Sequence, residues 1–102
     1  MENDRAILIS VIQAFLTEAP SLLQQFDDAV ATGNQEVALR SAHTLKSNFG
    51  ILQQQAEREI WQRLETLVKN NKFDELPEPA AQAHEMSQRA FEQLTAFLEG
   101  AG

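Results

Sequence analysis

The scarcity of helix-breaking residues in the middle of this chain most limits what it can fold into. Between Pro20 and Pro77 the sequence contains only two glycines, Gly33 and Gly50. Alanine, leucine, glutamine and glutamate, which favour helices, are common in this stretch, whereas the strand-favouring valine and isoleucine are sparse. The chain is therefore predicted to be all-α.

Apolar residues recur along the chain at the three- and four-residue spacing of a helix face. Two regular seams are Ala38, Ala42, Leu45, Phe49 and Leu52, and then Ile60, Trp61, Leu64, Leu67 and Val68. We expect Pro20 to bend or restart the first helical stretch, and a turn to lie near Gln54. Gly33 is expected to end one helix and Asn34 to cap the next. These patterns predict a single domain over residues 1–102, an antiparallel up-and-down four-helix bundle with a short additional N-terminal helix.

The charge of the chain and the residues it lacks narrow the function. Eight Lys+Arg against fifteen Asp+Glu give a net charge of -7, the wrong sign for binding nucleic acid or an anionic membrane surface. The absence of cysteine excludes disulfides, thiolate metal sites and cysteine nucleophiles. No apolar run approaches the ~18 residues of a membrane span, and the acidic start is unlike a signal peptide. We expect a cytoplasmic domain with no membrane and no nucleic-acid partner.

The helix predicted after Gly33 carries an exposed histidine. At about 100° per residue, its apolar seam centres about 140° away from His43, which therefore points to solvent. Between residues 37 and 56 the sequence has two basic residues, Arg40 and Lys46, and no acidic one. The histidine is thus expected on a locally cationic strip of an acidic protein.

This arrangement suits phosphoryl chemistry. An exposed imidazole can act as a nucleophile toward phosphorus and form a phosphohistidine. Lys46, one turn after His43, can place its ammonium near the added phosphoryl oxygens. Ser47 and Gly50 are small and leave the imidazole open to a partner protein, although a glycine in mid-helix costs about 1 kcal/mol relative to alanine. The alternative interpretation is an ordinary surface histidine beside a lysine, with a glycine that eases helix packing.

The literal sequence around this histidine is similar to that of a known family. The stretch from Ala42 to Asn48 (AHTLKSN), preceded by Phe15 to Leu23 (FLTEAPSLL), resembles the histidine-containing phosphotransfer domains of bacterial phosphorelays. The resemblance covers essentially the whole chain. It implies a bundle in which His43 accepts a phosphoryl group from a receiver-domain aspartate and passes it to another. Lys46 would be the cation next to the phosphate, and Gly50 a small docking position.

Three positions depart from the pattern of that family. Ser47 and Gln53 stand where glycine is frequent, and Phe49 stands where a small residue is usual. The helical wheel turns Phe49 inward, so this departure is expected to alter packing more than access to the histidine.

A carboxylate is predicted to lie beside the histidine. If the turn is centred near Gln54, antiparallel packing places His43, eleven residues before it, next to Glu65, eleven after it, and Lys46 opposite Gln62. Glu65 could accept a hydrogen bond from Nδ1 and leave Nε2 free as the nucleophile. The family often has Glu or Gln here. The alternative is a surface glutamate paired with Lys46.

No sequence motif indicates catalysis by the chain itself. It lacks a P-loop, a His-Glu-x-x-His zinc motif and the Glu-x-x-His pairs of di-iron bundles. His84 lies on or beside the apolar stripe of the last helix and is interpreted as a partly buried structural residue. We therefore expect a phosphocarrier, not an enzyme. It would bind no metal or cofactor, and Mg²⁺ would come from the partner receiver.

The prediction is a phosphorelay domain whose partners are response-regulator receiver domains and a hybrid sensor histidine kinase. It is expected to be a monomer. The predicted docking surface consists of Leu39, Arg40, Ser47, Gly50 and Ile51. Two alternatives stay open: a chemotaxis-kinase type of domain, phosphorylated directly by an ATP-binding domain, and a non-catalytic helical adaptor that has lost the relay.

Overall fold

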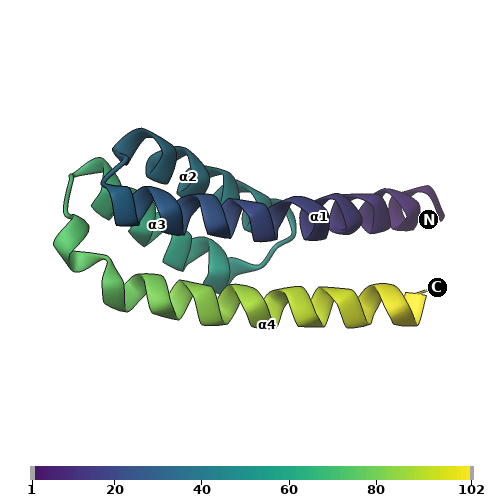
Figure 1. Cartoon of the computed structure of the whole chain (residues 1–102). Helices are drawn as coiled ribbons and strands as arrows, with labels where there is room; N and C mark the ends of the chain where they lie inside the picture. Colours follow the sequence, from purple (N-terminus) through teal and green to yellow (C-terminus); the bar gives the residue numbers. More distant parts are fainter. Residues whose placement is uncertain (1, 102) are drawn as a thin grey trace.

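Four long helices run alternately up and down the molecule in the computed structural model, which describes residues 2–101 (Figure 1). A single 3-10 turn precedes the last helix. The elements are α1 (Glu2–Thr32), α2 (Gln35–Ile51), α3 (Gln55–Lys69), η1 (Phe73–Glu75) and α4 (Pro77–Ala101). The bundle measures 46 × 20 × 20 Å, and α1 and α4 extend beyond the turn between α2 and α3 (Figure 1). The predicted antiparallel four-helix bundle is confirmed.

The prediction of a short additional N-terminal helix is wrong, because α1 continues through Pro20 as one helix of 31 residues. Proline removes one backbone N–H and crowds the preceding turn, which often ends a helix. Here Pro20 lies on the exposed side of α1, whereas Phe15, Ala19 and Leu22 around it are buried on one face. Burial of that continuous apolar face keeps the helix intact across the proline.

The two turns that flank α2 fix its position. Gly33 has a φ of +71°, and the side chain of Asn34 accepts a hydrogen bond from the backbone N–H of Val37 at 3.2 Å. At the other end Gln53 has a φ of 58°, and the N–H of Gln54 donates to the carbonyl of Phe49 at 2.9 Å. The predicted C-terminal glycine, the N-cap and the turn near Gln54 are therefore all present.

The core is made by the inner faces of all four long helices. The largest fully buried side chain is Trp61, whose indole packs edge-on against Phe26 at 5.1 Å between ring centroids and donates to the Ser87 hydroxyl at 3.0 Å. His84 is half-buried, and its Nε2 lies 2.7 Å from Oδ2 of Asp27. This pair joins α4 to α1, and the predicted partial burial of His84 is confirmed.

By length and composition alone, α1 could cross a membrane. A window of 18 residues within Asp4–Thr32 has a mean hydropathy of 1.7. Core helices of soluble proteins and signal sequences near an N-terminus pass the same test, and 28% of this window is buried. The side chains that pack α1 against the bundle come from this segment: Ile12, Phe15, Ala19, Leu22, Leu23, Phe26 and Ala29. The sequence-based expectation of no membrane segment therefore depends on the packing of α1 and not on its hydropathy.

Candidate functional site

His43 lies in the middle of α2 with its side chain 58% exposed. The opposite face of the helix is fixed in the core, because Ala42, Leu45 and Phe49 are fully buried. Because these residues occupy the inner face of α2, the imidazole points outward to solvent. The structure thus places this histidine on the surface, as the helical wheel predicts.

A carboxylate from the neighbouring helix contacts the inner nitrogen of that imidazole. Oε2 of Glu65 on α3 lies 2.8 Å from Nδ1 of His43, and the Glu65 side chain is only 16% exposed. A carboxylate can only accept hydrogen bonds, so Nδ1 carries the proton. In the neutral ring the lone pair is then on Nε2, the nitrogen available for attack on an electrophile.

Lys46 contacts the same carboxylate on its other oxygen. Nζ of Lys46 lies 2.7 Å from Oε1 of Glu65 and donates to Oε1 of Gln62 at 3.3 Å. The two sequence-based interpretations of Glu65, a partner of the histidine and a partner of the lysine, are therefore both present in one cluster. His43, Glu65 and Lys46 form what we call the acceptor cluster.

The environment of Glu65 holds it in its ionised form. Burial by itself raises the pKa of this carboxyl group, but the hydrogen bonds and charges of Lys46 and His43 outweigh burial. The pKa of Glu65 is consequently below its ordinary value of 4.5. At neutral pH the acceptor cluster therefore contains a carboxylate, which keeps the proton of the imidazole on Nδ1.

This lowered pKa predicts an acid-sensitive contribution to stability. A carboxyl group whose pKa is depressed by folding stabilises the native state above its unfolded pKa and loses that effect as the pH falls through the folded value. We expect Glu65→Gln to lower the free energy of unfolding at neutral pH, with the deficit shrinking as the pH falls below 4.5. Urea denaturation across this range measures the difference, and a deficit that does not change with pH would contradict the prediction.

The five residues predicted to receive a partner occupy different environments. Arg40, Ser47 and Ile51 are exposed, and Ile51 is 68% exposed, whereas Leu39 packs partly against the core. Gly50 is half-buried.

The space over Gly50 is occupied by a side chain from α3. A Cβ atom at Gly50 would lie 3.2 Å from Cδ of Arg58. The glycine therefore gives room to an arginine and does not leave the surface bare. Sequence analysis missed Arg58, although Gly50 and Arg58 are equidistant from Gln54, the same symmetry that pointed to Glu65.

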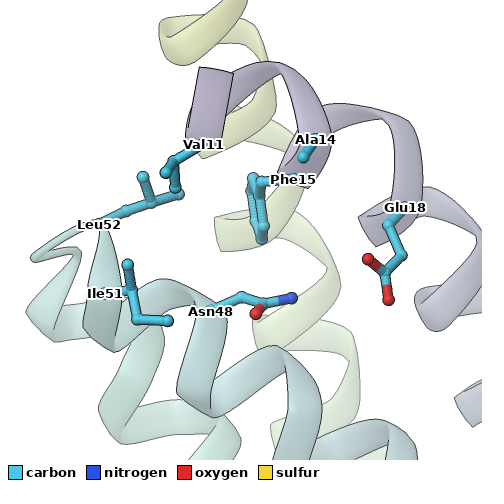
Figure 2. Close-up of a pocket in the computed structure, with 7 residues that line it drawn as sticks. All are labelled: Val11, Ala14, Phe15, Glu18, Asn48, Ile51 and Leu52. Atoms are coloured by element: carbon cyan, nitrogen blue, oxygen red, sulfur yellow. The ribbon is translucent and has the colours of Figure 1, made fainter. Parts of the chain in front are cut away.

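A shallow groove of about 140 Å³ lies between α1 and α2 (Figure 2). Phe15 of α1 faces Asn48 and Ile51 of α2 across it, and Glu18 lies at one side (Figure 2). The remaining lining residues are Val11, Ala14 and Leu52. Of these residues only Ile51 was among the predicted docking positions, because sequence spacing does not show which face of α1 lies beside α2.

Residues 4–100, whose side chains are described, contain no group of three or more His, Asp or Glu residues arranged to hold a metal ion. The acceptor cluster has one carboxylate, and that carboxylate is occupied by the imidazole and the ammonium. What the cluster offers is an exposed nucleophilic nitrogen with a cation close by.

Comparison with known families identifies one match. The model of the family described as Hpt domain matches residues 10–101, which include the acceptor cluster, the α1–α2 groove and both turns around α2. Searches of curated proteins and of solved structures gave no match.

Proposed function

As a member of the Hpt domain family the chain is a histidine phosphotransfer domain of a phosphorelay, and we propose that His43 is the residue that carries the phosphoryl group. The observation that supports this assignment most directly is the acceptor cluster. Its imidazole is exposed, its Nδ1 is bonded to a carboxylate, and a lysine lies within the same cluster. The other histidine, His84, is half-buried and paired through Nε2 with Asp27.

The proposed transfer uses the Nε2 lone pair of His43. Nε2 attacks the phosphorus of an aspartyl phosphate on a receiver domain, the bond from phosphorus to the aspartate oxygen breaks, and the aspartate leaves as a carboxylate. Transfer to a second receiver reverses these bond changes. Such reactions depend mainly on positioning and charge neutralisation, so a domain without its own metal site can take part. The receiver supplies Mg²⁺, and this domain acts as a carrier.

We place the docking surface around the acceptor cluster. It includes Leu39, Arg40, Ser47, Gly50 and Ile51, and through Ile51 it continues into the α1–α2 groove. This surface combines a low, partly apolar strip with the exposed histidine. Transient interfaces of this kind usually bury less than about 1,200 Å². The proposed partners are response-regulator receiver domains and a hybrid sensor histidine kinase. We propose that the domain binds them as a monomer in the cytoplasm.

A labelling experiment tests the proposed function. The purified domain is incubated with a receiver phosphorylated on its aspartate, with ³²P as the label, and we expect acid-labile label on His43. Label on His84, or none at all, would contradict the proposal. Label obtained only with ATP and a kinase ATP-binding domain would instead identify the chemotaxis-kinase type of acceptor.

Gly50→Arg is expected to slow transfer from the receiver strongly while leaving the melting temperature close to that of the wild type. The new side chain would stand two turns from His43 on the proposed docking surface, and the Arg58 side chain that it meets is exposed and flexible. Transfer rates and thermal unfolding are measured on the same preparation.

Gly50→Ala is the matched control. It gains up to about 1 kcal/mol of helix propensity, less the cost of moving Arg58 by a few tenths of an ångström, and transfer should stay at the wild-type rate. Equal transfer rates for Gly50→Arg and the wild type would show that the receiver does not approach over this position.

A further inference from the structure

Arg58 lies across α2 on the side of the bundle that carries His43. A Cβ atom at Gly50 would be 3.2 Å from Cδ and 3.3 Å from Nε of Arg58, so the arginine stem rests on the glycine. Gly50 is seven residues from His43, which places it two turns and about 10 Å further along the same face of α2. The guanidinium group is therefore beside the surface on which we place the receiver.

No acidic side chain of the domain is paired with Arg58. Among the described residues Arg58 forms no ion pair, whereas Lys46 and Lys72 each pair with a glutamate. On a helix, the side chains that can reach an arginine lie three or four residues away. The four residues at those positions are uncharged: Gln54, Gln55, Trp61 and Gln62. The guanidinium of Arg58 is thus free to bind a carboxylate of another molecule.

The charge of the chain is distributed unevenly, and the distribution favours the same surface. Residues 35–72, which form the α2–α3 hairpin and the turn after it (Figure 1), contain six basic and four acidic residues and carry a net charge of +2 with histidine neutral. The rest of the chain contains two basic and eleven acidic residues and carries −9. An acidic partner is therefore attracted to the hairpin and repelled by the remainder of the domain.

We propose that Arg58 binds a carboxylate on the surface of the receiver and so determines how the receiver docks over His43. A receiver that holds Mg²⁺ beside its aspartate presents carboxylates there, because Mg²⁺ is bound by oxygen ligands. Arg58 crosses α2 two turns from His43, so it meets the rim of that acidic site and not the phosphoryl group. The inference rests on the proposed function and adds to it a residue that selects an acidic partner.

Arg58→Glu tests this recognition directly. With a phosphorylated receiver at low ionic strength, we expect the receiver concentration for half-maximal transfer to rise about tenfold, a typical loss for one charge-assisted contact at an interface. The maximal rate at saturating receiver should stay close to that of the wild type, because the acceptor cluster is unchanged. At about 1 M salt, where the Debye length is only about 3 Å, the variant and the wild type should differ much less.

Arg63→Glu is the matched control. Arg63 is exposed on the same helix, but it lines a groove between α3 and α4 with Ile60, Gln82 and Met86. The substitution changes the net charge by the same amount, and we expect it to raise the half-saturating concentration by less than about twofold. Equal rises in the two variants would overturn the inference, as would an unchanged concentration in Arg58→Glu.

Arg58→Gln is the milder variant, because it keeps part of the stem over Gly50 and removes only the charge. It should raise the half-saturating concentration by a smaller factor, and it keeps the test valid if the reversed charge lowers the melting temperature. A fall in the maximal rate with an unchanged half-saturating concentration would mean that Arg58 acts on the chemical step, and this result would also overturn the inference.

A small phosphoryl donor distinguishes failure of this inference from failure of the proposed function. Phosphoramidate, whose phosphoryl group moves to Nε2 of His43 as ammonia leaves, needs no docking surface. Failure of both phosphoramidate and the receiver to label the wild type would refute the proposed function, and this inference would fall with it. Label on the wild type, with an unaltered dependence on receiver concentration in both Arg58 variants, refutes the inference alone.

Discussion

His43→Gln is expected to abolish phosphoryl acceptance completely while leaving the helical bundle intact. Glutamine has no nucleophilic ring nitrogen, so no covalent phosphohistidine can form at this position. The side chain is 58% exposed, and among the described residues its polar partner is Glu65 at 2.8 Å. Surface substitutions of this kind change the free energy of unfolding by less than about 1 kcal/mol. Label from a phosphorylated receiver and circular dichroism of the same sample measure the two halves of the prediction.

His84→Gln is the matched control for that experiment. It removes the other histidine of the chain, which is bonded to Asp27 between α1 and α4, and it should keep the full label. Undiminished label on His43→Gln would show that another residue carries the phosphoryl group. Loss of helicity in His43→Gln would show that the imidazole has a structural part that its exposure does not suggest.

The sequence could predict the acceptor cluster because antiparallel helices joined by a short turn have a simple symmetry. Once Gln54 is placed in the turn, residues at equal distances from it must lie side by side, and His43 and Glu65 satisfy this condition. The same rule places Lys46 opposite Gln62, and the structure has that contact at 3.3 Å. Prediction succeeded here because helix period and turn position decide the result without any knowledge of side-chain conformation.

The symmetry about Gln54 does not predict the contact between Lys46 and Glu65. These residues are not equidistant from the turn, and a long side chain can reach either of two partners. The choice between the imidazole and the ammonium as partner of Glu65 depended on the directions of three side chains. The structure shows a carboxylate that uses one oxygen for each, a solution that backbone symmetry does not reveal.

Pro20 and Gly50 show that a residue's local tendency does not decide its role. The tendency of proline to end a helix was outweighed by the continuous buried face of α1 on both sides of it. Gly50 is open in a helical wheel, yet Arg58 of α3 occupies its space. In both cases tertiary packing determined the structure. The continuity of α1 at Pro20 and the space over Gly50 both depend on contacts with other helices of the bundle.

Phe49→Ala is expected to cost about 3–5 kcal/mol of folding free energy, the largest effect on stability among the substitutions considered. The ring is fully buried, and its centroid lies 5.0 Å from that of Phe15 and 6.4 Å from that of Phe91. It therefore joins α2 to both α1 and α4. A loss of this size is a large part of the stability of a small domain, commonly about 5–15 kcal/mol. Urea denaturation monitored by circular dichroism measures it.

Ile51→Ala, two residues further along α2, is the control because its side chain is 68% exposed and its loss should change stability by about 0.5 kcal/mol or less. Phe49→Ala should still accept a phosphoryl group in its folded fraction. Ala42 and Leu45 are buried and anchor the turn of α2 from which His43 points to solvent. A cost below about 1 kcal/mol would mean that the neighbouring rings collapse into the space left behind. Loss of phosphorylation under conditions where Phe49→Ala is fully folded would mean that this ring positions the imidazole. Phe49 would then serve phosphoryl transfer as well as the packing of the core.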